Sequence, residues 1–220
     1  MHVEKQTVSK ILILLCIALL LTGCSKTYYS AMEKIGVHKR DILVNRVEGA
    51  RDAQTEAQEQ FKSALEQFAA VVELKETDLK EVFDKLNTEY IDCEKASEKV
   101  SERIDKVENV SEALFDEWEK ELELYENKML RRSSKKQLKK TRSHYREMLA
   151  SMHTAEKSIA PVLNTFRDNV LFLKHNLNAQ AIGSLRSEFS GLKKDIRVLI
   201  KKMNTAIKDS NAFIAQMESA

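Results

Sequence analysis

Residues 79–130 read LKEVFDKLNTEYIDCEKASEKVSERIDKVENVSEALFDEWEKELELYENKML, and this stretch decides the fold. Two series at seven-residue spacing run through it. The first is Leu79, Leu86, Cys93, Val100, Val107 and Leu114, and the second is Phe83, Tyr90, Ser97, Ile104, Ser111, Trp118 and Tyr125. Apolar residues dominate both series, which is the pattern of coiled-coil-like packing. A continuous helix over this stretch would be roughly 78 Å long, so we expect a rod rather than a compact ball.

Apolar residues at three- and four-residue spacing also mark the segments on either side. The earlier segment has Val47, Ala50, Ala57, Phe61, Ala64, Phe68 and Val71, and Gln54 interrupts this stripe. A third helix is expected to carry Leu138, Tyr145, Met148, Met152, Ala155, Ile159, Val162, Phe166 and Leu173. The last helix is expected to carry Leu185, Phe189, Leu192, Ile196, Leu199, Met203, Ala206, Phe213 and Met217. Pro161 lies inside the expected third helix and predicts a kink there.

The turns are harder to place because the chain has only 5 Gly and 1 Pro. Ser134 and Gln137 have the spacing of a capping box, which predicts a turn over 131–134 and a helix start at Ser134. Charged residues make up 32% of the chain. Few turn-forming residues and many charges favour long helices. The predicted fold class is all-α: an elongated antiparallel helical bundle, or coiled-coil hairpin, of three to four long helices within 41–220.

The N-terminal stretch predicts an export signal. Lys5 and Lys10 precede an apolar run over 11–21, which is shorter than the roughly 20 residues of a spanning helix. The following Leu21-Thr22-Gly23-Cys24 resembles the lipobox of bacterial lipoproteins. This resemblance implies that 1–23 is a signal peptide and that Cys24 is lipidated as the first residue of the mature chain. An uncleaved anchor and an ordinary secretory signal are the alternatives.

The same resemblance implies a location. Residues 24–40 would form the lipid anchor and its tether, and the chain would meet the membrane through Cys24. It would then lie on the periplasmic side of a bacterial membrane. Ser25 follows the cysteine, whereas an Asp at this position commonly signals inner-membrane retention in lipoproteins. The resemblance therefore favours the outer membrane.

A wider resemblance covers most of the mature chain. The lipobox, the long heptad helices and the stretch from Leu171 to Leu185 are together similar to a family of uncharacterised bacterial proteins known as a domain of unknown function. This resemblance implies no activity. Long helical chains also attract labels such as "DNA repair ATPase". The phosphate-binding loop G-x-x-x-x-G-K-[ST] is absent from this sequence, which argues against such a label.

Charge is unevenly distributed around the expected hairpin. Residues 94–126 carry twelve acids and five bases, whereas 128–146 carry nine bases and no acid. One interpretation is a charge zipper between two antiparallel helices. The other is a basic tip that binds anionic lipid headgroups or an acidic protein. The residues of that possible tip are Lys128, Arg131, Arg132, Lys135, Lys136, Lys139 and Lys140.

No pattern in the sequence nominates a catalytic residue, a metal ligand or a cofactor. With Cys16 in the signal and Cys24 lipidated, Cys93 stands alone, so neither a disulfide nor a zinc site of cysteines is expected. His144, Met148 and Met152 share a helix face that could hold Cu(I), but methionines on an apolar face are far more often core residues. A net charge of +2 and poor aromatic interleaving argue against nucleic acid as a partner.

These observations favour a non-enzymatic, lipid-anchored periplasmic protein that presents a long coiled-coil surface to a protein or envelope partner. A self-associating structural spacer of the envelope is the first alternative. An enzyme whose site forms only in three dimensions is the second.

Overall fold

The structure, a computed structural model, describes residues 28–29, 32–73, 79–176 and 179–219. The expected signal peptide over 1–23 and the expected lipidation site Cys24 lie outside the described residues. Five helices make up the described bundle: α3 (Lys39–Glu73), α4 (Leu79–Leu122), α5 (Lys128–Glu156), α6 (Ile159–His175) and α7 (Ala179–Glu218).

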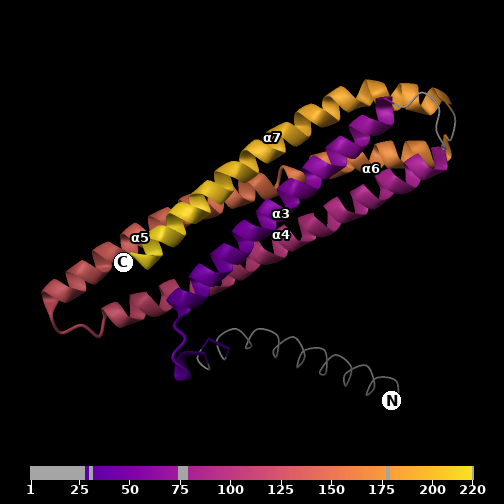
Figure 1. The fold of residues 1–220 in the computed structure, drawn as a ribbon. Helices are drawn as coiled ribbons and strands as arrows, with labels where there is room; N and C mark the ends of the chain where they lie inside the picture. The colour runs from indigo at the N-terminus through magenta and orange to yellow at the C-terminus, as the bar shows by residue number, and fades with distance from the viewer. Residues whose placement is uncertain (1–27, 30–31, 74–78, 177–178, 220) are drawn as a thin grey trace, which may run out of the picture.

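The helices form an elongated antiparallel bundle of four rods, in which α5 and α6 follow one another as the third rod (Figure 1). α3 packs on α4 and α7, and α7 also packs on α5 and α6. α4 has 44 residues, which gives it a length of about 66 Å at 1.5 Å per residue. The predicted all-α, elongated bundle is confirmed.

The core is a continuous apolar seam along the bundle axis. Every position of the predicted stripes in α3, α5 and α6 is buried, and nearly all of those in α7 are. Aromatic rings interlock near the C-terminal end of α3, where Phe68 stacks on Phe189 at 5.7 Å between ring centroids and meets Phe166 edge-on at 6.1 Å. Such pairs add to the free energy gained from burying the rings.

The predicted kink at Pro161 is a break between two helices. α5 ends at Glu156 and α6 begins at Ile159, so Pro161 lies in the first turn of α6. Proline is tolerated there because the first amide groups of a helix have no intrahelical acceptor, whereas its ring would clash with the preceding turn of a continuous helix. The side chain of Lys202 donates a hydrogen bond to Ser158 at 2.6 Å and so ties the break to α7.

The predicted turn over 131–134 is wrong, because the chain turns earlier. α4 ends at Leu122, and α5 begins at Lys128 with Asn127 as its N-cap. The Asn127 side chain accepts hydrogen bonds from the backbone amides of Met129 and Leu130, at 2.9 and 3.2 Å. Ser134 therefore does not start a helix. It lies inside α5 and accepts a hydrogen bond from the Trp118 indole at 2.8 Å.

The α4–α5 hairpin is longer than the rest of the bundle. α3 begins at Lys39, and Arg40 donates a hydrogen bond to the carbonyl of Met217 near the end of α7. Both lie level with Trp118 of α4, because Arg40, Met217 and Trp118 line one cavity. Beyond this level α4 and α5 are the only described helices that continue, and their connecting loop protrudes in Figure 1.

One polar side chain in the core has no partner among the described residues. Gln54 of α3 is fully buried, and neither its amide nitrogen nor its amide oxygen makes a hydrogen bond. By contrast Gln58, one turn later, donates hydrogen bonds to Asn204 at 2.9 Å and to the carbonyl of Ile200. Burying an unpaired polar group costs about 1–3 kcal/mol, so Gln54 weakens the stripe that it interrupts.

We expect Gln54→Leu to stabilise the protein, because leucine fills a similar volume without polar atoms. Removing the penalty should raise the melting temperature by about 2–6 °C for a chain of this size. Gln58→Leu is the matched control. It should lower the melting temperature, because it leaves Asn204 without its partner. Thermal melts followed by circular dichroism measure both variants, and a destabilised Gln54→Leu would contradict this view of the core.

Candidate interaction site at the hairpin tip

We call residues 123–140, the α4–α5 turn and the first turns of α5, the hairpin tip. The apolar side chains at its turn are exposed, because none of the described helices other than α4 and α5 reaches them. The exposed fraction is 79% for Leu124, 40% for Tyr125, 82% for Met129 and 56% for Leu130. Leu138, two turns further along α5, is buried again. The tip therefore has a small exposed apolar surface at its turn and the first turn of α5.

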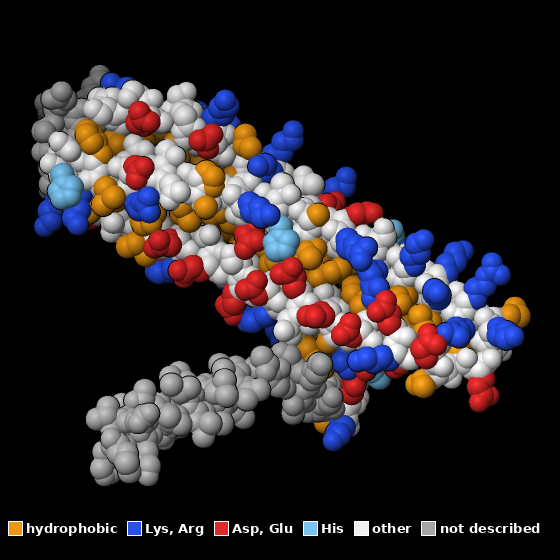
Figure 2. Space-filling model, turned by 180° about the vertical axis from the view of Figure 1, so that it is seen from behind, with side chains coloured by type: hydrophobic (Ala, Val, Ile, Leu, Met, Phe, Trp, Pro, Cys, Tyr) orange, Lys and Arg blue, Asp and Glu red, His pale blue; other side chains and the backbone are white. Residues whose placement is uncertain are grey.

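The hairpin tip is also strongly basic, with seven bases and two acids, a net charge of +5. Lys128, Arg132, Lys135 and Lys139 recur at three- and four-residue spacing, so they share one helix face. Figure 2 shows Lys and Arg side chains along the edge of the bundle towards the tip, with acidic side chains gathered behind them. The basic segment of the sequence thus lies at the tip end of the rod, and the acidic segment lies behind it.

The structure shows how few of these bases pair with α4. Arg131 forms an ion pair with Glu123 at 2.5 Å, and Arg142, just beyond the tip, pairs with Glu119. In the described part of the chain, no salt bridge reaches Lys128, Arg132, Lys135, Lys136, Lys139 or Lys140. These two ion pairs join the two helices, and the other predicted tip residues are exposed to solvent. Their role in binding stays a prediction.

A small cavity lies at the base of the tip. It has a volume of about 210 Å³ and is lined by Arg40, Leu114, Glu117, Trp118, Glu121, Gln137, Thr141 and Met217. This volume is below the 300–1,000 Å³ of typical small-molecule sites. Burial raises the pKa of the Glu121 carboxyl, and the neighbouring Glu117 adds to this shift.

The first described residues are fastened to α4 at the same end. The Tyr29 hydroxyl donates a hydrogen bond to the side-chain oxygen of Asn109 at 2.7 Å, and the Tyr29 ring is buried. The buried ammonium group of Lys39 binds Glu117 at 2.9 Å and also binds Glu33. Burial opposes the charge on Lys39, but these two carboxylates outweigh it and raise the Lys39 pKa. No periodic pattern in the sequence indicates either contact.

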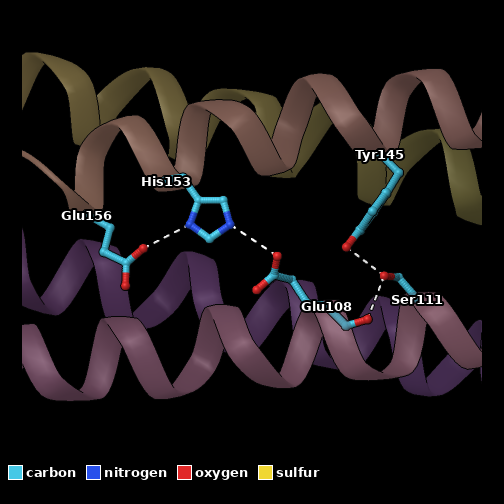
Figure 3. A network of polar contacts seen from close by, with 5 residues as sticks. All are labelled: Glu108, Ser111, Tyr145, His153 and Glu156. Atoms are coloured by element: carbon cyan, nitrogen blue, oxygen red, sulfur yellow. Dashed lines mark hydrogen bonds and ion pairs between the residues drawn. The ribbon is translucent and has the colours of Figure 1, made fainter.

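A second polar network lies midway along the hairpin (Figure 3). His153 of α5 contacts Glu156 through Nδ1 at 2.9 Å and Glu108 of α4 through Nε2 at 3.2 Å. Burial opposes protonation of His153, but the two carboxylates outweigh it, so its pKa is raised. Ser111 Oγ lies 2.6 Å from the Tyr145 hydroxyl oxygen, and this pair does not reach the imidazole. Both ring nitrogens are therefore occupied by carboxylates.

The remaining sulfur and histidine candidates belong to the bundle interior or its surface. Met148 and Met152 are buried core residues, and His144 lines a surface groove with Glu147 and Asp209. Burial raises the pKa of the Cys93 thiol to about 12, so it is not a thiolate at neutral pH. No cluster of three or more metal-binding His, Cys, Asp or Glu occurs in the described ranges. None of the described helices combines the length and the apolar character that crossing a membrane requires.

The fold and the site define an elongated all-α bundle with a basic, apolar-ended hairpin. The chain belongs to the family described as "Protein of unknown function (DUF2959)", whose model matches residues 28–217. The expected kinship with a family of unknown function is thereby confirmed. The matched range begins after Cys24, so it concerns the bundle and not the anchor. No curated protein and no solved structure matches the chain.

The ion-pair pattern makes a prediction about stability. Reversing Lys135, Lys136, Lys139 and Lys140 to Glu should leave the melting temperature within about 2 °C, because none of them pairs with α4 and exposed charges contribute little. Arg142→Gln should lower it by about 2–4 °C, because Arg142 binds Glu119 and lies over the Phe115 ring at 5.0 Å. A large loss in the fourfold variant would instead support the zipper.

The His153 network should make stability depend on pH. Because the folded-state pKa is raised, its contribution is complete below the unfolded pKa of about 6.5 and is lost as the pH rises through the folded pKa. We expect His153→Gln to lower the melting temperature by about 2 °C near pH 6 and by less near pH 8.5. An equal effect at both pH values would show that the charge on His153 does not stabilise the hairpin.

Proposed function

We propose that this chain is a non-enzymatic, lipid-anchored helical protein on the periplasmic side of a bacterial membrane, where its long helical surface meets a protein or envelope partner. The observation that carries the proposal is the hairpin tip. The α4–α5 hairpin extends past the other described rods and exposes Leu124, Met129 and Leu130 among bases of which, in the described chain, Arg131 alone forms a salt bridge. Exposed apolar residues rimmed by polar ones mark interaction sites.

The direction of the chain supports an anchored rod. Tyr28 and Tyr29, the first described residues, lie at the end of the bundle that carries the hairpin tip, and α3 and α6 end at the far end (Figure 1). Lipidation at Cys24, four residues before Tyr28, would therefore attach the rod near its tip end. The lack of Asp after Cys24 supports the outer membrane as the site of attachment.

Three features support a role without catalysis. The imidazole of His153 has a carboxylate on each nitrogen, so neither nitrogen faces a nucleophile. The thiol of Cys93 is buried and protonated. The described lining of the cavity at the tip base has no Ser, Cys or His. These side chains act as packing and pairing groups, which fits a surface that binds rather than a site that transforms a substrate.

The anchor is tested by labelling cells that express the full chain with a fatty-acid analogue. The wild type should incorporate the label at Cys24 and fractionate with the membrane, most of it with the outer membrane. Cys24→Ala should lose the label and yield an unprocessed or displaced chain. Cys93→Ala is the matched control and should keep the label, because Cys93 is buried in the folded chain. Absence of label at Cys24 in the wild type would sink the lipoprotein proposal.

A further inference from the structure

The shape of the hairpin tip limits what it can bind. Its exposed apolar residues cluster at the turn and the first turn of α5, and Arg132, Lys135 and Lys136 follow one to two turns behind. Two helices that end in a turn form a narrow convex point. Stable protein–protein interfaces bury roughly 1,000 Å² or more of complementary surface, which a flat or concave face provides more readily than a narrow point. A fluid surface can close around it.

The chemistry of the tip matches the interface of an anionic bilayer. Leucine and methionine side chains partition into the region between headgroups and acyl chains, and basic side chains one turn behind stay among the phosphates. Each Lys or Arg near an anionic membrane surface contributes attraction. We infer that the hairpin tip docks onto an anionic phospholipid bilayer, with Leu124, Met129 and Leu130 in the interface and the basic face on the headgroups.

The bilayer is the one that holds the anchor, and in this respect the inference rests on the proposed function. Cys24 lies four residues before Tyr28, so it can be no more than about 14 Å away from it. Tyr29 is hydrogen-bonded to Asn109 in the tip-side half of α4. Asn109 lies about 20 Å from the C-terminal end of that helix. A tilted rod can therefore place both the anchor and the tip on one membrane surface. The anchor raises the local concentration of the tip there.

The charge pattern sets the orientation. Behind the tip, residues 94–121 of α4 carry ten acids and five bases. An anionic surface attracts the tip, with its net charge of +5, and repels this acidic stretch. The tip is thereby drawn to the lipid, while the acidic stretch, to which Tyr29 holds the segment after the anchor, stays further from it.

The test uses the lipid-anchored full chain, purified from cells and reconstituted into vesicles of phosphatidylcholine with roughly a quarter phosphatidylglycerol. Trp replaces the 82%-exposed Met129, and quenching by brominated lipid reports its depth. Val198→Trp on α7, at a 45%-exposed position away from the tip, is the control. Native Trp118 is common to both variants. We expect quenching at position 129 to exceed that at 198 by at least about twofold, and to fall in pure phosphatidylcholine or in about 0.5 M salt.

Charge variants give the second arm. Replacing Lys135, Lys136, Lys139 and Lys140 by Gln in the Met129→Trp chain should reduce the quenching by at least about half. The same loss of charge on α7, at Lys194, Arg197, Lys201 and Lys208, should leave it unchanged. Quenching at 129 no stronger than at 198, or unaffected by lipid charge, would overturn the inference and leave an acidic protein as the partner of the tip. Fatty-acid labelling of the same samples reports the anchor separately, so the two proposals can fail independently.

Discussion

A four-helix core can close only where four helices lie side by side, and this constraint shapes the whole molecule. Along most of the rod the apolar stripe of each helix packs against the stripes of the other helices. Core side chains such as Phe68 of α3 and Phe213 of α7 are buried there. At the level of Lys39 and Met217 two of the rods end, and the hairpin continues alone. The seam then loses its cover, so Leu124 and Leu130 are exposed although their character matches the core.

The same constraint explains how much of the fold the sequence predicted. Heptad spacing identified the buried stripes of α3, α5 and α6, most of that in α7, and the α4 series from Leu86 to Leu114, whereas Phe83, Tyr90 and Trp118 of the second α4 series are only partly buried. Pro161 marked the helix break, because this signal is local. The turn was misplaced because the apolar pattern continues past Leu122 through Tyr125 and Leu130. Those residues read as seam but belong to the tip. The N-cap at Asn127 gave a weaker pattern than the capping box at Ser134, which tertiary contact with Trp118 overrides.

The contacts within the site, unlike the helices, could not be predicted from local sequence patterns. The basic residues of the tip could be read from composition, but which of them pair with α4 depends on a register that only the packed helices fix. Tyr29 with Asn109 and His153 with Glu108 are 80 and 45 residues apart in the chain, so no local pattern announces them. Together these contacts hold the segment before α3 on α4 and join α5 to α4 midway along the rod.

The central claim is that this end faces the membrane. Hydrogen–deuterium exchange on the reconstituted lipid-anchored chain tests it most directly, because residues 123–126 are exposed and lie between α4 and α5, so this turn should exchange fast in detergent. The account predicts slower exchange at 123–130 in anionic vesicles than in detergent, with no change where α6 ends around His175 at the far end of the rod. Unchanged exchange at 123–130, or protection at the far end instead, would contradict it.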